Sequence, residues 1–437
     1  MTNCTRKNLS FPALNRRKIE AEFSGGDITS DGGVLLLRKM DKQLGLMTSI
    51  DHILHDPREQ DQVTHSQISL LRQRVYGLCL GYEDLNDHKT LRTDPAIQTA
   101  LDRDNVLASQ STLCRLDNRT DRRAMVDIHK VFFEQFIASF KKPPKELILD
   151  FDATDDPTHG SQEQVFYHGY YRHYCFLPLY VFCKGQMLVS YLRPSNIDGA
   201  KHSGAILKLL VTALREVWPN VHIIFRGDGG FCRHTMLSWC ERYNVSYIVG
   251  YTRNKRLEKI IAAALEATQK QFEITKEKQR DFMCFRYGAK SWNKQRQVIA
   301  KLEVTDKGPN PRFIITNLPG DAQALYDGVY CARGDMENRI KEQQLGLFAD
   351  RTSAHDWWAN QFRLLLSSLA YILLESIRRI ALKGTELERA QATTIRLKLL
   401  KIGAVILRNT RRIRFLLSSH YPHQKLFKTV TARLQSG

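Results

Sequence analysis

The stretch LILDFDATDD, residues 147–156, carries the pattern from which the fold is predicted. Its first part is apolar, as in a buried strand, and successive side chains along a strand point to opposite faces of the sheet. Leu149 and Phe151 therefore share one face. Asp150 and Asp152 share the other. Carboxylates beside a buried strand cost stability unless cations or hydrogen bonds compensate for them. The stretch thus predicts a core strand that ends at a polar site.

Asp152 is preferred over Asp150 as the functional carboxylate of this strand because it lies closer to the strand's end. Asp155 and Asp156 have a simpler explanation. With Pro157 they have the composition of a turn that leaves a strand.

The segments that follow predict an α/β core. Two further strands, joined by a turn at Lys184-Gly185, are followed by helices that alternate with strands. Antiparallel strands followed by alternating helix and strand are the order of a ribonuclease H-like core. The predicted strands cover 174–183, 186–194, 221–231 and 245–251, and the predicted helices cover 200–216, 233–244, 333–347 and 356–382.

Residues 272–318 have a different pattern. Alternating apolar runs separated by Gly-Pro-Asn-Pro predict a mainly antiparallel β subdomain within the core, with the whole insertion at about 255–328. The sequence Lys-Lys-Pro-Pro at 141–144 is typical of a linker. Three regions are therefore predicted: a mainly helical DNA-binding region over 1–140, a catalytic core over 145–382, and a basic region over 383–437.

Charge indicates a polyanionic partner. The chain has 65 Lys and Arg against 46 Asp and Glu, a formal net charge of +19, and no acidic residue follows Glu388. A basic, solvated helix with no ligand is the alternative for the C-terminal region. Near the other end, residues 109–123 predict a helix that enters a DNA groove with Arg115 and Arg119 near one side. An ordinary packing helix fits that segment equally well.

The nine cysteines are odd in number and include no C-x-x-C pair, so neither a zinc ribbon nor a disulfide framework is indicated. The N-terminus lacks the apolar stretch of a signal peptide. The most apolar segment, Leu364 to Leu374, is too short to span a bilayer. We expect reduced thiols and a soluble, cytoplasmic protein without a membrane segment.

Two further carboxylates lie at positions suited to a catalytic site. Asp228 follows a short apolar strand and begins the turn Gly-Gly at 229–230, although Asp is also common in turns for its own propensity. Glu337 lies on a predicted helix, where steps of three or four residues place polar side chains on one face. A solvated face is the alternative there. The other members of this face are Tyr330, Arg333, Lys341 and Gln344.

Asp152, Asp228 and Glu337 together match one chemical need. Cleaving or transferring a phosphodiester requires stabilised charge on the attacking and leaving oxygens. Two Mg²⁺ ions about 4 Å apart provide this when carboxylates from different elements hold them. Hard oxygen ligands suit Mg²⁺ or Mn²⁺ and not zinc.

At this point the chain resembles a bacterial insertion-sequence transposase of the DDE class, in the group with a β insertion, and most closely insertion-sequence family 1380. The resemblance covers nearly the whole chain. The strings that carry it are GGDITSDGGVLLLRKMDKQLGL, LRQRVYGLCLGYEDLNDH, LDFDATDDPTHG, YHGYYRHYCFLPLYVF, FRGDGGF, YCARGDMENRIKE and LFADRTS.

The resemblance implies the roles of these residues. The D-x-T match gives Asp152 as the first catalytic Asp, and D-x-G-[YF] gives Asp228 as the second. In the signature Y-x(2)-R-x(3)-E-x(6)-K, Tyr330, Arg333 and Glu337 match in register, but Gln344 replaces the last Lys. In such enzymes the Tyr, Arg and Lys contact DNA phosphates, and Lys341, one turn earlier, is a candidate substitute.

The implied reaction is cleavage at the transposon's terminal inverted repeats, followed by attack of the released 3′-hydroxyl on target DNA. A homodimer is expected for synapsis, in a bacterial cytoplasm at the nucleoid. Relatives with a β insertion often pass through a hairpin and stack an aromatic residue on a flipped base. Trp292 is the candidate for that role, and a hydrophobic anchor of the β subdomain is the alternative.

Two other functions remain compatible with the sequence. One is a transposase-derived DNA-binding protein that no longer catalyses, which the Gln344 departure favours and the intact triad opposes. The other is a ribonuclease H-like nuclease without strand transfer. Inverted repeats that flank the gene would favour the transposase over the nuclease.

Overall fold

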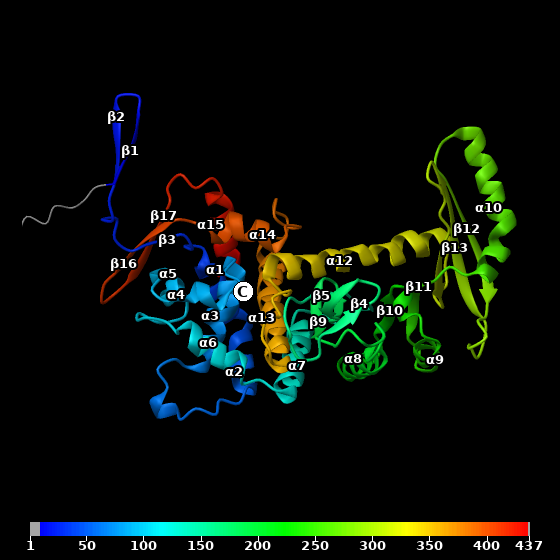
Figure 1. Ribbon diagram of the computed structural model, residues 1–437, viewed down its shortest axis with the longest axis horizontal. Helices are drawn as coiled ribbons and strands as arrows, with labels where there is room; N and C mark the ends of the chain where they lie inside the picture. Colours follow the sequence, from blue (N-terminus) through cyan, green and yellow to red (C-terminus); the bar gives the residue numbers. More distant parts are fainter. Residues whose placement is uncertain (1–8, 436–437) are drawn as a thin grey trace, which may run out of the picture. The chain divides into compact units, whose positions relative to one another are not determined.

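The computed structural model describes residues 9–435 of the chain. These residues form two compact units, which Figure 1 shows coloured by sequence. One unit contains the chain up to residue 51, residues 56–116 and everything from residue 376 onward; the other contains 52–55 and 117–375. The predicted boundaries at 140, 145 and 382 follow a different division, because the first unit combines segments from both ends of the chain.

A mixed sheet of nine strands forms the centre of the 117–375 unit. Its order is β12-β13-β15-β11-β10-β4-β8-β9, with β14 paired to β13. The strands β4, β10 and β11 are parallel, and β8 is antiparallel to both of its neighbours, β4 and β9. The α/β class is confirmed. The bounds are β4 Glu146–Ala153, β8 Leu179–Cys183, β9 Gln186–Tyr191, β10 His222–Gly227, β11 Ser246–Tyr251, β12 Gln279–Tyr287, β13 Arg296–Thr305, β14 Gly308–Pro309 and β15 Arg312–Thr316.

The residue types before and after β8 explain how this strand begins and ends. Lys184 and Gly185 have φ values of 52° and 77°, and two successive residues with positive φ form the hairpin turn that matches the twist of paired strands. The single strand predicted over 174–183 is wrong. Pro178 interrupts it, because proline has no N–H to donate to a neighbouring strand. The first part of that segment forms β7 (His173–Phe176) in a separate small sheet of order β5-β7-β6. The bounds of its other strands are β5 Asp156–Pro157 and β6 Phe166–His168.

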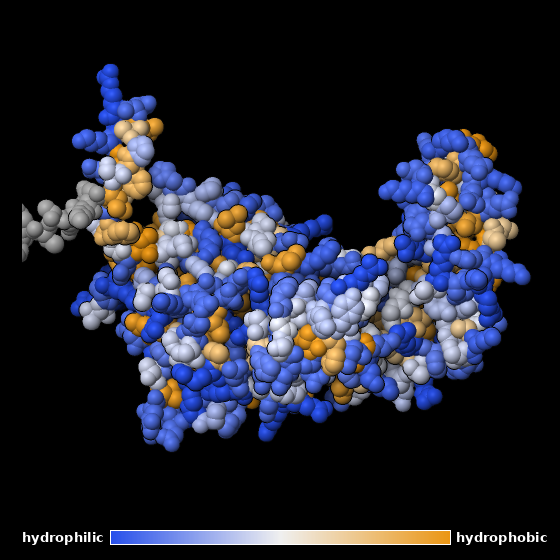
Figure 2. Space-filling model, viewed as in Figure 1, coloured by the Kyte–Doolittle hydropathy of each residue, from blue (hydrophilic) through white to orange (hydrophobic). Residues whose placement is uncertain are grey.

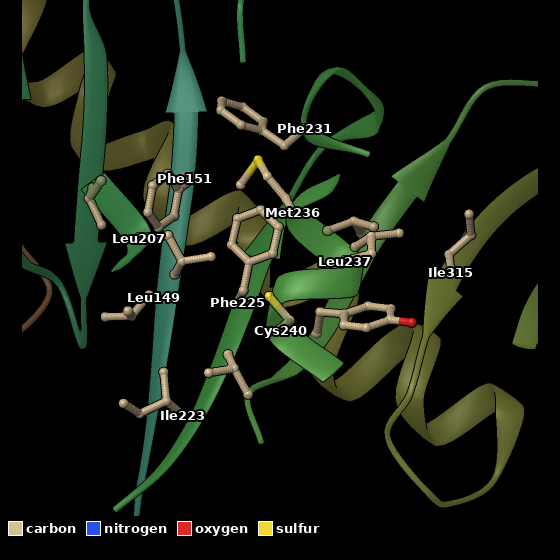
Figure 3. Packing of buried hydrophobic residues seen from close by; sticks show 14 of the residues in the cluster. Leu149, Phe151, Leu207, Ile223, Phe225, Phe231, Met236, Leu237, Cys240 and Ile315 are labelled. Atoms are coloured by element: carbon tan, nitrogen blue, oxygen red, sulfur yellow. The ribbon is translucent and has the colours of Figure 1, made fainter. Parts of the chain in front are cut away.

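Apolar side chains pack on both faces of the large sheet. Leu149 and Phe151 point into the larger cluster with Phe225, and the rings of Phe151 and Phe225 have centroids 5.2 Å apart (Figure 3). A smaller cluster on other strand residues includes Ile224 and Leu325. Burial on both faces explains why the central strands are nearly continuous apolar runs.

Helices of this unit are α7 Arg122–Ala138, α8 Ser203–Val217, α9 His234–Arg242, α10 Lys255–Thr275 and α13 Trp357–Ser376. A further helical run begins at Ala322, contains α12 (Gly334–Lys341) and has π-helical turns over Leu325–Tyr330 and Glu342–Gly346. The run starts at Ala322, about two turns before Tyr330, and so begins earlier than the predicted start at 333.

The predicted β insertion differs from the structure in two respects. Residues 255–275 form the helix α10, and the antiparallel strands after it do not make a sheet of their own. Instead β15 pairs with β11, so that these strands extend the large sheet. An edge strand with unpaired backbone groups accepts a further strand readily, and sequence periodicity does not reveal which sheet a strand joins.

The other unit is mainly helical and joins the two ends of the chain. In a small sheet of order β17-β16-β3, Ala404 pairs with Thr29. Gly33 lies against the chain from the other end, since a Cβ on it would lie 2.0 Å from the Leu399 carbonyl oxygen. This contact explains why the GGDITSDGG segment ends in glycine. The bounds are β1 Leu9–Leu14, β2 Arg17–Ala21, β3 Ile28–Thr29, α1 Val34–Leu44, α2 Leu46–Ile53, α3 Gln67–Leu80, α4 His88–Leu91, α5 Pro95–Ala100, α6 Gln110–Asp117, α14 Ala392–Ile395, β16 Ala404–Arg408, β17 Ile413–Leu417 and α15 Gln424–Arg433.

The basic C-terminal region is not one solvated helix. Its arginine-rich part forms the hairpin β16–β17, in which Arg408 is opposite Ile413, and a helix follows only from Gln424. Within residues 9–435, no helix combines the length and the apolar character needed to cross a bilayer.

Candidate active site

The register of two parallel strands brings Asp152 and Asp228 together. Phe151 of β4 is opposite Gly227 of β10, so the next residue on each strand is an aspartate. Residues opposite each other in parallel strands point to the same face of the sheet. Asp228 then accepts a hydrogen bond from the Gly230 N–H at 2.9 Å, which holds its carboxylate at the start of a tight turn. The carboxyl ends of both strands therefore present acidic side chains at one edge.

Arg333 connects the helical run to these strands. Its Nη1 is 3.2 Å from Asp152 Oδ2, and its Nη2 is 2.5 Å from Glu337 Oε1. Glu337 is one turn further along the helix than Arg333. One guanidinium thus holds two of the three sequence-predicted carboxylates, and Arg333 itself lies 181 residues after Asp152 in the chain.

The pKa of Asp152 reflects its burial and the charged groups around it. Burial raises the pKa of Asp152 to about 7, Arg333 opposes the rise, and the charges of Asp228 and Glu337 add to it. The side chain is only 15% exposed, so water screens these charges poorly. A buried carboxyl with a raised pKa and further carboxylates nearby is typical of sites that bind a cation or transfer a proton.

Asp150, the second choice from the sequence, is already paired. Arg226 is opposite it in the register of β4 and β10, and Arg226 Nη2 donates to Asp150 Oδ2 at 2.7 Å. A second bond joins Arg226 Nε to the same carboxylate, and Nη1 donates to the Val329 carbonyl oxygen. Both side chains are buried. This internal ion pair occupies Asp150 and leaves Asp152 as the carboxylate that faces the site.

Comparisons with known proteins show the family of the chain. The pattern of the family described as "Transposase DDE domain group 1" matches residues 11–437. The chain belongs to this DDE transposase family. No curated protein matches it. Among solved structures, a cryo-EM structure of the piggyBac transposase synaptic complex with hairpin DNA matches with 13% sequence identity and a TM-score of 0.42, covering 85% of this chain and 79% of that one.

Tyr330 lies beside the turn that follows Asp228. A Cβ on Gly250 of β11 would lie 2.7 Å from the Tyr330 hydroxyl oxygen and 2.7 Å from the Gly229 nitrogen. Only glycine at 250 permits this approach, because both neighbours contact the same side of the strand. Tyr330 is therefore held beside the turn that begins at Asp228.

Gln344 also reaches the site. Its Nε2 donates to the Asp155 carbonyl oxygen at 3.0 Å, which joins the helical run to the chain just after Asp152. Lys341 is exposed on α12. The stripe predicted from spacing thus brings Tyr330, Arg333, Glu337 and Gln344 to the strand ends, with Lys341 at the surface.

The other predicted DNA-binding residues lie elsewhere. Trp292 packs against Tyr251 and Tyr287, with ring centroids 5.4 and 5.8 Å away, and the Arg296 guanidinium lies over its ring at 5.2 Å. This packing favours the alternative of a hydrophobic anchor. Arg115 is exposed on α6, and Arg119 follows that helix and is partly buried. Their contact with DNA stays a prediction.

Two residues of the site were missed from the sequence. Arg226 lies within an apolar strand, and its pairing with Asp150 requires the knowledge that β4 and β10 are neighbours in register. Tyr171 belongs to the string YHGYYRHY, which carries part of the family resemblance. Burial and then the charges of Asp155 and Asp152 raise the pKa of the Tyr171 hydroxyl, so its ring lies near the carboxylates.

Metal binding was tested on the described residues. Across 9–435, no three or more His, Cys, Asp or Glu side chains are arranged to hold a metal ion. At this site the Arg333 guanidinium contacts both Asp152 and Glu337 and supplies a positive charge. The donor set nevertheless fits a divalent cation, because hard carboxylate oxygens are its preferred ligands and Asp152 has a raised pKa that a cation would reverse.

Proposed function

We propose that this DDE transposase binds the terminal inverted repeats of a bacterial insertion sequence and cuts and joins DNA strands there. The observation that carries the proposal is the in-register placement of Asp152 and Asp228 at adjacent parallel strand ends, with Glu337 tied to Asp152 through Arg333. The strand order β9-β8-β4-β10-β11 is that expected of a ribonuclease H-like core, and it supports the same conclusion. The resemblance to insertion-sequence family 1380 supplies the substrate class.

Asp152, Asp228 and Glu337 are the proposed ligands of two Mg²⁺ ions, which Mn²⁺ would replace. When bound, such ions stabilise negative charge on the attacking and leaving oxygens of a phosphodiester. Before binding, Arg333 neutralises Asp152 and Glu337. Once these carboxylates have another cation partner, the guanidinium is free to donate two hydrogen bonds to a DNA phosphate. Tyr330 and Lys341 are the other proposed phosphate contacts.

The reaction proceeds in two displacements at phosphorus. Water attacks the phosphodiester at the transposon end, and the 3′ oxygen leaves. The resulting 3′-hydroxyl then attacks a target phosphodiester in the same site. The formal charge of +19 favours the DNA partner throughout. Two copies of the chain are proposed to hold the two ends, in the cytoplasm at the nucleoid.

The test is cleavage of a supercoiled plasmid that carries the element's inverted repeats. We expect nicking with Mg²⁺ and none with EDTA. Asp152→Ala, Asp228→Ala and Glu337→Ala should each abolish cleavage and leave end-binding within a few-fold. Asp335→Ala is the matched control, because this exposed carboxylate lies on the same helix and should retain activity. Activity in any triad variant would remove that residue from the site.

Two alternative functions would give different results. A DNA-binding protein without catalysis would bind the ends and never nick them with Mg²⁺ or Mn²⁺. A nuclease would nick the plasmid but yield no joined product with a target.

A further inference from the structure

A tyrosine-rich hairpin follows the first catalytic strand. It is formed by β6 and β7, in which Tyr167 is opposite Tyr174 and His168 is opposite His173. The loop 169–172 has the sequence Gly-Tyr-Tyr-Arg, and the Arg172 N–H closes it by donating to the His168 carbonyl oxygen at 2.7 Å. The hairpin is thus a defined element whose tip consists of two tyrosines and an arginine.

The base of the hairpin is anchored beside Asp152. Its strand β7 pairs with β5, which begins only four residues after Asp152. His173 Nε2 is 2.8 Å from Asp155 Oδ2, and Gln344 binds the backbone of the same Asp155. The hairpin, the first catalytic strand and the helical run that carries Glu337 therefore meet at one short segment.

Several aromatic rings of the hairpin are exposed. The fraction exposed reaches 83% for Tyr170, 59% for Tyr174 and 56% for Tyr167. The Tyr170 ring contacts Tyr171 edge to face, with centroids 5.0 Å apart and an interplanar angle of 85°. Tyr171 is partly buried and contacts the Tyr170 ring, which remains in solvent. Exposed aromatic surface of this size is characteristic of a binding site.

The charge of the hairpin suits a nucleic acid. Residues 164–176 contain no Asp or Glu, while Arg172 is exposed beside Tyr170. The hairpin is anchored at Asp155, three residues after Asp152, to which the cleavage reaction is assigned. A strand cut at Asp152 would leave the site near this anchor, and its bases unpair most easily next to the break.

We propose that the tip of this hairpin, with Tyr170 at its centre, stacks on an unpaired DNA base next to the cleaved phosphate. Tyr170 supplies the stacking surface, Tyr171 positions it, and Arg172 binds the adjoining phosphate. The inference rests on the proposed function. Base stacking on an aromatic side chain tolerates any base, so the site would recognise the absence of pairing and not a sequence.

The test uses the full chain without catalytic metal, so that binding is measured apart from cleavage. The probes are a DNA duplex and the same duplex with a three-nucleotide gap that contains 2-aminopurine. We expect the wild type to quench 2-aminopurine fluorescence in the gap. Tyr170→Ala should lose the quenching and bind the gapped probe roughly tenfold more weakly, with duplex affinity unchanged. Tyr170→Trp should retain both properties.

The matched control is Tyr243→Ala. Tyr243 is also exposed, at 48%, but precedes β11 and lies at the amino edge of the parallel strands, away from the carboxylates. Unchanged quenching in Tyr170→Ala would overturn the inference, as would an equal loss in Tyr243→Ala. A change of molecular mass in light scattering, without a change in quenching, would instead assign the hairpin to a contact between copies.

The outcome is independent of catalysis. If the plasmid is never cut but Tyr170-dependent quenching remains, the proposed function fails and the base-stacking site stands. If cleavage proceeds and Tyr170→Ala binds the gapped probe like the wild type, only the stacking site fails.

Discussion

Arg333 is the residue on which the charge balance of the site depends. It donates to both Asp152 and Glu337, and its side chain is only 18% exposed. An arginine so placed competes with a metal ion for the same carboxylates. It is also the closest cation for a DNA phosphate that approaches them. We therefore expect the same guanidinium to oppose metal binding before DNA arrives and to favour phosphate binding afterwards.

Removal of this side chain should separate the two effects. We expect Arg333→Ala to lower the cleavage rate at least tenfold, because a charge-assisted phosphate contact is lost. Mn²⁺ affinity, measured by titration calorimetry, should stay equal or rise because the competing cation is gone. Arg333→Lys should be intermediate, since an ammonium cannot bridge two carboxylates as a guanidinium does. Weaker Mn²⁺ binding in Arg333→Ala would contradict this account.

Asp156 makes stability depend on pH. The side chain is 1% exposed and accepts a hydrogen bond from Thr352 Oγ1 at 2.8 Å. Burial raises the pKa of Asp156 from 3.8 to about 8, Thr352 opposes the rise, and Asp350 and Asp155 add to it. The folded pKa lies above the unfolded one, so the folded chain binds the extra proton between these values. This contribution to stability is therefore present at low pH and is lost as pH rises toward 8.

The corresponding measurement is urea unfolding at several pH values. Between pH 5 and 8 the wild type should lose up to about 1.4 kcal/mol of unfolding free energy per pH unit through this one group. Asp156→Asn keeps the shape and cannot ionise, so its stability should fall less over the same range. Parallel pH profiles for the two proteins would show that Asp156 does not titrate in this window.

At the scale of elements, the pairing of β4 with β10 places two pairs of side chains opposite each other. It opposes Asp150 to Arg226 in the interior, and one step further it opposes Asp152 to Asp228 at the edge. The first pair holds the strands in register by an ion pair, and the second forms the site. A shift of one residue would separate both pairs, so register and function are coupled.

This coupling predicts a structural role for Asp150. Asp150→Asn or Arg226→Met leaves one buried charge without its partner and should cost about 3–5 kcal/mol of unfolding free energy. The double variant should recover much of the loss, which a double-mutant cycle measured by urea unfolding would detect. If Asp150→Asn abolished cleavage with unchanged stability, Asp150 and not Asp152 would be the ligand.

At the scale of the whole molecule, the ribbon β1–β2 is an unpartnered surface. Leu9 is opposite Ala21 and Phe11 is opposite Ile19, so these four side chains share one face. All are exposed, and Figure 2 shows apolar side chains along this ribbon. An isolated two-stranded ribbon is marginally stable in water, which indicates that another surface covers it. For a protein proposed to act on two DNA ends, a second copy of the chain is the occupant we propose.

Serine on the apolar face should therefore reduce self-association. We expect the variant with Leu9→Ser, Phe11→Ser and Ile19→Ser to shift from dimer to monomer in light scattering. It should also lose joint capture of two transposon ends while it still binds one. The control is Lys18→Ser with Glu20→Ser on the opposite face, which should remain dimeric. A wild-type monomer that still pairs two ends would leave the ribbon without this role.

The sequence alone determined much of what is local. The sequence shows three short-range patterns directly: the apolar run that ends in Asp152, the glycine turn after Asp228 and the helical spacing of Arg333 and Glu337. The α/β class, most strands and most helices follow from the same periodicities. The family resemblance then selected Asp152, Asp228 and Glu337 as a set.

Only the tertiary structure decided which distant segments meet. Arg226 neutralises Asp150 because two strands pair in one register, and the strands after α10 extend the large sheet because β11 offers them an edge. The joining of the two chain ends in one unit and the position of the tyrosine hairpin beside Asp152 have the same origin. Periodicity describes how a segment distributes its own side chains, whereas partners far apart in sequence are chosen by backbone pairing and packing. For that reason each of the three carboxylates could be proposed from its own segment. The contact of the arginine with two of them could not.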